Sequence, residues 1–249
     1  MTFERYAIFW APRADDPFAA FERAWFGNGA NVSENHLTET VTESEPEGSP
    51  NESSPFRLKQ ILALEAELAA RAIRIPSRYA LHGTMKAPFR PREGMKQSVF
   101  IEAMAAFCAC RRRVVTGKLR LHRFPRFLAL VPENETAELD WLADSCVTHF
   151  DHFRSPLTPE DRARRGDMSS TEAALFEQFG YHFIFNNFKF HITLAGPLDE
   201  PELDALQPAL ATAVAPLCEE PFAVEDLCLF GDPGEGAPFQ LVERFSLMR

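Results

Sequence analysis

The chain has 249 residues, of which 45% are apolar, enough for one large domain or two lobes of about 100 residues each. Its net charge of −10 argues against binding extended nucleic acid through a basic surface. Six acidic residues lie within residues 29–55, which hold no Lys or Arg, and without them the net charge is only −4. A local basic pocket for a small anion therefore remains compatible with the composition.

Five cysteines, with no C-x-x-C pair among them, predict reduced thiols and a cytoplasmic protein. The first apolar run is short and ends at Pro12, so we expect no signal peptide. No stretch approaches the roughly 18 apolar residues that a membrane span needs, so a membrane is not an expected partner. The sequence leaves the oligomeric state open.

The first half of the chain mixes strands and helices. Apolar alternation predicts strands, helical spacing predicts helices, and Pro and Gly mark their ends. Residues 29–55 are rich in Ser, Thr, Asn, Glu and Pro, which predicts a mobile acidic loop. The other expected elements are a strand over 5–10, helices over 17–25 and 55–73, a strand over 81–89, a helix over 95–110, and a hairpin of 114–124 with 127–131.

The second half repeats this mixture. Thr158 is a good helix N-cap, because Pro159 follows it and Asp161 stands three residues on. Gly180 is expected to end the helix that precedes the last third of the chain. The expected elements are a helix over 134–153, a helix beginning after 158, a helix over 170–179, a strand over 188–194, a helix over roughly 200–217, and strands over 222–230 and 239–247.

This order of elements predicts an α+β fold rather than a regular βαβ repeat. Each half has a helix-rich approach, a His-x-Thr strand, a following helix and two closing strands. We therefore expect one bilobal domain over 1–249, with two mainly antiparallel sheets and flanking helices around a central cleft. The lobes, related by a pseudo-two-fold axis, are expected to divide into about 1–131, which includes the acidic loop, and 132–249.

Two strands carry the same short motif, His82-Gly83-Thr84 and His191-Ile192-Thr193. Strand alternation places each His and Thr on a polar face, together with a Lys two residues away, Lys86 in the first copy and Lys189 in the second. A third match, His36-Leu37-Thr38, lies in the acidic loop without a strand pattern and is interpreted as a chance occurrence. We expect the two strands to face each other across the cleft.

These residue types suit the cleavage of a phosphate ester without a metal. Two imidazoles with pKa values near 6.5 can hold opposite protonation states, so one can act as base and the other as acid. Threonine hydroxyls can donate to the non-bridging oxygens, and lysines can offset the charge that develops on them. The sequence does not say which histidine is the acid.

The pattern resembles the two-histidine (2H) phosphoesterase superfamily, which includes 2′-5′ RNA ligase-like and cyclic nucleotide phosphodiesterase proteins. The finer resemblance is to a bacterial branch of uncharacterised proteins associated with phosphonate metabolism. It rests on five segments that span almost the whole chain: 5–9, 81–89, 152–158, 190–194 and 229–231. The acidic loop stands where that pattern has a shorter connection.

The resemblance implies catalytic roles for His82 and His191 and phosphate contacts for Thr84 and Thr193. We predict further contacts to the substrate from four residues, namely Lys86, Arg154, Lys189 and Tyr6. The implied activity is hydrolysis of a cyclic phosphate or 2′-type phosphodiester of a small nucleotide or sugar phosphate. No cofactor and no metal are expected.

Other interpretations are possible for some of these features. The same cleft could bind a nucleotide or phosphorylated metabolite without turnover. His149 and His152 share a helix face and could hold Zn²⁺, but no third ligand is evident nearby, so a role at the helix surface or at the edge of the cleft is favoured. His122 and His182 lie in strand-like runs and are interpreted as structural. The loop over 231–236 lacks the Lys-Ser/Thr of a phosphate-binding P-loop.

Overall fold

Nine strands form two antiparallel sheets in the computed structural model, which describes residues 3–27, 66–134, 136–164 and 166–249. The predicted acidic loop, and the first part of the helix expected over 55–73, lie outside the described residues. The larger sheet has the order β4-β5-β6-β2-β1-β8-β9. Its strands are β1 Arg5–Trp10, β2 Gly83–Phe89, β4 Leu119–Arg123, β5 Leu128–Pro132, β6 Ile192–Ala195, β8 Asp226–Asp232 and β9 Gln240–Ser246.

Helices cover this sheet, while β3 (Val114–Val115) pairs with β7 (Ala223–Val224) in the second, two-stranded sheet. The helices are α1 Pro17–Phe26, α3 Ala66–Ile73, α4 Gln97–Cys108, α5 Ala137–Phe150, α6 Pro159–Ala163, α7 Ser170–Phe179 and α8 Glu200–Val214. Short 3₁₀ turns lie at Pro76–Arg78, Asp151–Phe153, Phe185–Asn187 and Ala215–Cys218. The predicted α+β class with antiparallel sheets is confirmed.

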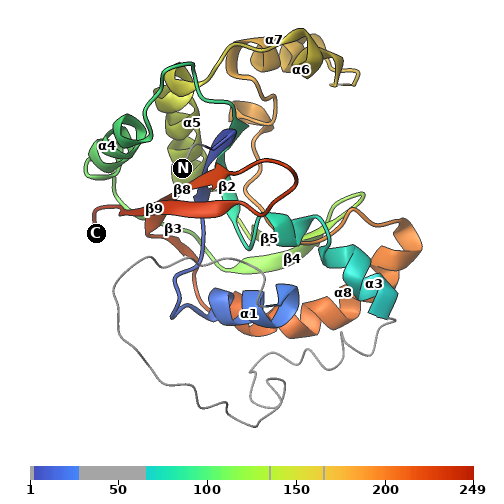
Figure 1. The fold of residues 1–249 in the computed structure, drawn as a ribbon. Helices are drawn as coiled ribbons and strands as arrows, with labels where there is room; N and C mark the ends of the chain where they lie inside the picture. The colour runs from blue at the N-terminus through green and yellow to red at the C-terminus, as the bar shows by residue number, and fades with distance from the viewer. Residues whose placement is uncertain (1–2, 28–65, 135, 165) are drawn as a thin grey trace, which may run out of the picture.

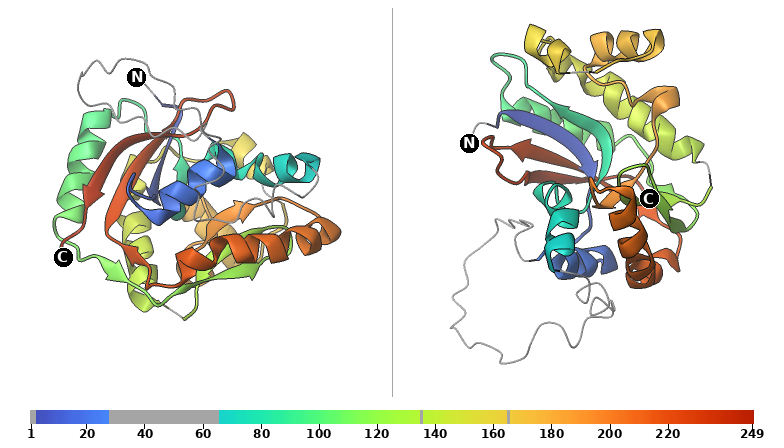
Figure 2. Two further views of the ribbon diagram at one scale, coloured as in Figure 1. Left: turned by 90° about the horizontal axis from the view of Figure 1, so that it is seen from below. Right: turned by 90° about the vertical axis from the view of Figure 1, so that its right-hand side faces the viewer.

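The larger sheet consists of two groups of strands, each with its own helices. Helix α5 packs on β2 and α4 on β8 and β9, whereas α8 packs on β4 and α3 on β6. Figure 1 shows α4 and α5 at one end of the molecule and α1, α3 and α8 at the other. Both views of Figure 2 place α1 beside α8. Among the described residues, no helix is both long and apolar enough to cross a membrane.

These groups do not follow the expected division at residue 131. Strands β4 and β5 come from the first half of the chain but pair with β6 from the second, and β8 and β9 pair back onto β1. The seven strands also form one continuous sheet, joined between the groups by β2 and β6, instead of one sheet for each half. Periodicity identifies strands but carries no information on which distant strand is the partner, so the sequence could not predict this exchange.

Strand β1 is buried on both faces. Its even-numbered residues Tyr6, Ile8 and Trp10 belong to the main hydrophobic core. Its odd-numbered residues Ala7 and Phe9 belong to a smaller cluster on the opposite face, with Ala11 just after the strand and with Cys228, Phe230 and Phe239. The two faces of the central sheet are thus chemically distinct, and the smaller cluster marks the face on which the first motif histidine lies.

The contact between the two strand groups is narrow. Strand β2 pairs with β6 through Gly83 opposite Ile192, and a Cβ atom added to Gly83 would lie 2.3 Å from the Phe190 ring. Phe190 is itself buried, so its ring has little room to move. Glycine at position 83 therefore allows the two motif strands to approach each other.

We predict that Gly83→Ala lowers the free energy of unfolding by about 1–3 kcal/mol, because the added methyl group overpacks the junction. Urea denaturation followed by circular dichroism measures the change. Gly166→Ala is the matched control, because nothing lies within 4 Å of a Cβ atom at that position; a change within about 0.5 kcal/mol is expected there. Equal stability of the two variants would contradict the close packing at Gly83.

Candidate active site

The two motifs lie side by side at the starts of adjacent strands of one sheet, with His82 directly before β2 and His191 directly before β6. The antiparallel pair Gly83–Ile192 fixes the register. Continuing it by one residue on each side sets His82 opposite Thr193 and Thr84 opposite His191. Directly opposite residues of an antiparallel pair point to the same face, with Cβ atoms about 5 Å apart, and diagonal neighbours are about 7–8 Å apart. The two histidines thus occupy one diagonal of a four-residue patch and the two threonines the other.

His82 is held in place by the backbone before it and by aromatic rings. Its Nδ1 lies 3.0 Å from the carbonyl oxygen of Ala80. Ala80 has a φ angle of +58°, a conformation that non-glycine residues rarely adopt and that often marks a functional site. The imidazole packs against Phe9, with ring centroids 4.3 Å apart, and against Tyr79 at 5.7 Å.

His191 repeats this arrangement on the other strand. Its Nδ1 lies 2.8 Å from the carbonyl oxygen of Lys189, again two residues earlier in the chain. Phe124 and Phe127 flank its ring at 5.8 and 5.6 Å. Because a carbonyl can only accept, Nδ1 carries the proton in both histidines. Each neutral imidazole therefore leaves its Nε2 unprotonated and able to accept a proton.

The surroundings keep both imidazoles neutral near pH 7. Burial lowers the pKa of His82 to about 4; the Ala80 carbonyl opposes this shift and the nearby charge of His191 adds to it. Burial also lowers the pKa of His191, against the opposing effect of the Lys189 carbonyl. The influence of His191 on His82 agrees with the short diagonal between them. A bound anion would favour the protonated form of either ring and so raise these pKa values.

Lys86 does not share the face of His82 and Thr84, so the predicted placement of all three on one polar face is wrong. The predicted contact of Lys86 with the substrate stays a prediction. The pairing of β1 with β2 shifts register between Phe9, which faces Thr84, and Ile8, which faces Lys86. This bulge turns Lys86 toward α5, where its Nζ donates to the Val147 carbonyl at 3.2 Å and lies 3.3 Å from Asp151 Oδ1. Lys86 is 4% exposed, and burial lowers the pKa of its ammonium. A strict period of two cannot anticipate a bulge.

Arg154 and Tyr6 also lie away from the four motif residues. Arg154 donates to Asp151 from Nε at 2.9 Å and to the Gln178 carbonyl from Nη2 at 2.7 Å, so it shares the carboxylate that pairs with Lys86. Tyr6 is 3% exposed, and its hydroxyl donates to Gln97 in the helix-covered core. The predicted substrate contacts of these residues stay predictions.

A cavity of about 760 Å³ adjoins Lys86 and Arg154. Arginines are prominent in its wall, yet most of them are paired: Arg5 and Arg78 with Asp232, and Arg90 with Asp161. Arg5 and Arg78 also lie over the rings of Phe239 and Tyr79, the aromatic group that flanks His82. The cavity therefore opens beside the His82 end of the patch, although neither motif histidine lines it.

Strand β4 contributes His122, which was interpreted from the sequence as structural, and Arg120, which no sequence motif singled out. His122 pairs across to Ala129, which pairs with Thr193, and Arg120 pairs with Val131. Arg120 and His122 therefore lie on the same face as the motifs. Lys189 is exposed, and its charge acts on His122. Alternation along the predicted strand over 114–124 implies that Arg120, His122 and Phe124 share one face. It does not say which face of the sheet that is.

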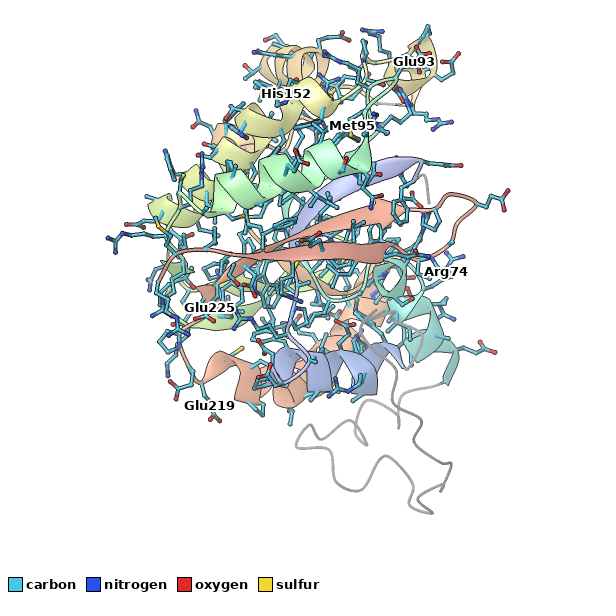
Figure 3. All side chains as sticks on the ribbon, turned by 60° about the vertical axis from the view of Figure 1, so that its left-hand side comes forward. Arg74, Glu93, Met95, His152, Glu219 and Glu225 are labelled. Carbon is cyan, nitrogen blue, oxygen red and sulfur yellow. The ribbon has the colours of Figure 1, made fainter. Side chains whose placement is uncertain are left out.

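No group of three or more His, Cys, Asp or Glu side chains in the described part of the chain could hold a metal ion. The rings of His149 and His152 lie 6.4 Å apart. His149 packs against Phe107, and His152 lies in the 3₁₀ turn after α5, at the end of the molecule that holds α4 and α5 (Figure 3). His149 therefore has a packing role, whereas His152 is exposed at the surface, with its ring 4.1 Å from that of Phe153.

A family model described as "Protein of unknown function (DUF1045)" matches residues 84–240. The chain belongs to the DUF1045 family. Two curated relatives are named ribose 1,5-bisphosphate phosphokinase PhnN. One, from Janthinobacterium sp. (strain Marseille), is 29% identical over 94% of this chain and 49% of its own length. The other, from Laribacter hongkongensis (strain HLHK9), is 28% identical over 95% of this chain and 50% of its own length. The DUF1045 chain thus spans about half the length of these relatives.

Solved structures give more distant similarities. One is titled as a phosphoesterase, with a TM-score of 0.46 and 14% identity over the full length of both chains. Another is E. coli LigT complexed with NADP+, with a TM-score of 0.45 and 13% identity, also over both full chains. The DUF1045 chain is similar to both structures only at low sequence identity.

We predict that NMR titration finds His82 neutral from pH 8 down to about 5, since its pKa lies at about 4, and finds the Nδ1–H tautomer for both motif histidines. The His82→Gln variant identifies the imidazole signal of His82, because that signal is missing from its spectrum. Because the folded-state pKa lies below the unfolded value of about 6.5, this group destabilises the fold as pH drops through 6.5 toward 4. An ordinary pKa, or a proton on Nε2 in the neutral form, would contradict the described environment.

We predict that Asp151→Asn costs roughly 3 kcal/mol of unfolding free energy, because it leaves the buried Lys86 ammonium without its carboxylate. Asp204→Asn is the matched control, since the Asp204 pair with Arg123 is exposed and is expected to contribute less than about 1 kcal/mol. Chemical denaturation measures both variants. Similar losses in the two would show that Asp151 has no special structural role.

Proposed function

We propose that this DUF1045 chain is a phosphoesterase that hydrolyses a cyclic phosphate or 2′-type phosphodiester of a small phosphorylated sugar or nucleotide without a metal ion. The observation that carries the proposal is the diagonal pair of histidines at the starts of adjacent strands. Both have Nδ1 bound to a carbonyl and Nε2 available for proton transfer. Acid–base cleavage needs two such groups within reach of one phosphorus.

The four motif residues account for the steps of hydrolysis. One neutral histidine takes the proton of an attacking water at Nε2 as the new P–O bond forms. The other, protonated under the influence of the substrate's negative charge, donates to the oxygen whose bond to phosphorus breaks. The hydroxyls of Thr84 and Thr193 donate to the non-bridging oxygens. The cyclic diester thereby becomes a monoester, and the two histidines end in exchanged protonation states.

A phosphorylated sugar is favoured as substrate by the names of the two curated relatives, which act on a ribose bisphosphate. The DUF1045 chain holds no G-x-x-x-x-G-K-[ST] sequence. We therefore assign the phosphokinase activity of those relatives to the half that this chain does not span, and a phosphoesterase step on a related sugar phosphate to the matching half. The same proposal includes a role in phosphonate metabolism, which the family resemblance implies, and a cytoplasmic location, which the cysteine pattern predicts.

We predict that His82→Ala and His191→Ala each lower turnover by on the order of 10²–10⁴-fold while the protein stays folded. The assay measures release of monoester from 2′,3′-cyclic nucleotides and ribose cyclic phosphates in the presence of EDTA. His152→Ala, outside the patch, is the control and should keep full activity. Tight binding without hydrolysis in the wild type would instead indicate a binding module, and loss of wild-type activity with EDTA would indicate a metal-dependent reaction.

A further inference from the structure

Positively charged and imidazole side chains gather on β4 beside the motif patch. Register places His122 in line with Ala129 and Thr193, and Arg120 in line with Val131 and, one strand further, His191. Two strand spacings separate β4 from β6, about 9–10 Å. The small side chain of Ala129 stands between His122 and Thr193.

The side chains of this group converge. Arg120 Nη1 lies 3.2 Å from His122 Nδ1. A guanidinium can only donate, so Nδ1 of neutral His122 accepts and its Nε2 carries the proton. This tautomer is the reverse of that in His82 and His191. His122 packs edge-on against Phe124 at 4.6 Å, and Phe124 in turn contacts the ring of His191. The group presents hydrogen-bond donors next to the reacting centre.

The charge of the group is not compensated. In the part of the chain that the structure describes, no carboxylate forms an ion pair with Arg120 or Lys189. By contrast, Arg123 on the same strand pairs with Asp204 and Glu200, and Arg5, Arg90 and Arg154 in the cavity are also paired. Burial, together with the charges of Arg120 and Lys189, lowers the pKa of His122. A bound anion would supply the negative charge that Arg120 and Lys189 do not receive from a carboxylate.

We propose that Arg120, His122 and Lys189 form a second anion subsite, which binds a further phosphate group of the substrate while the first reacts at the two histidines. The proposal rests on the proposed function, and it narrows the substrate to a sugar or nucleotide cyclic phosphate with a separate phosphate monoester. Arginine suits this task, because its planar donors bind phosphate oxygens in pairs. The sugar bridges the interval between β6 and β4, along the ring of Phe124.

Adenosine 2′,3′-cyclic phosphate, with and without a 5′-phosphate, tests the subsite. In the wild type the 5′-phosphate should raise kcat/KM by on the order of tenfold or more, through charge-assisted hydrogen bonds. Arg120→Gln should remove most of this gain and leave the rate on the unphosphorylated compound unchanged. Arg123→Gln, on the same strand but paired with Asp204, is the matched control and should keep the gain. An equal effect of the two substitutions, or no gain in the wild type, would overturn the subsite.

Calorimetric titration separates this idea from the proposed function. Adenosine 2′,5′-bisphosphate should bind the wild type at least tenfold more tightly than adenosine 2′-phosphate, and Arg120→Gln should abolish the difference. If this result holds but neither cyclic compound is hydrolysed, the subsite stands and the phosphoesterase assignment fails. If both cyclic compounds are hydrolysed equally and the two ligands bind equally, the subsite fails and the phosphoesterase assignment stands.

Discussion

The candidate site depends on the pairing of β2 with β6 at Gly83 and Ile192. This contact joins the two strand groups of the larger sheet, and it sets each histidine diagonally across from the other. The absence of a side chain at Gly83 admits the ring of Phe190 and keeps the strands close. A shift of one residue would move one motif to the opposite face, where helices cover the sheet.

Two groups of titratable side chains around β2 differ in how their charge is held. On the motif face, burial and aromatic neighbours keep His82 and His191 neutral, with their Nε2 atoms free of protons. Lys86, which is buried and turned toward α5, and Arg154 share the partly exposed carboxylate of Asp151. The first arrangement suits proton transfer, because small changes in local charge shift an imidazole between its two states. The second connects α5 with β2 and positions the frame of the site.

Period-two alternation was sufficient to predict the strand over 5–10 and the polar face of His82 and Thr84. A local capping signal was sufficient for the start of α6, where Thr158 and Asp161 form the reciprocal cap that the sequence suggested. The predictions failed where distant parts of the chain decide the outcome. The bulge that redirects Lys86 arises from pairing with β1, and the neighbours of His122 depend on how β4, β5 and β6 align. No local pattern encodes either feature.

A crystal structure of the protein with bound phosphate or tungstate would show directly whether the two histidines share one phosphorus site. One anion should lie within hydrogen-bond distance of Nε2 of both His82 and His191 and of the Thr84 and Thr193 hydroxyls. An anion found only in the arginine-lined cavity beside Arg154, or Nε2 atoms more than about 10 Å apart in a closed site, would contradict a shared site, because acid and base could not then reach one phosphorus.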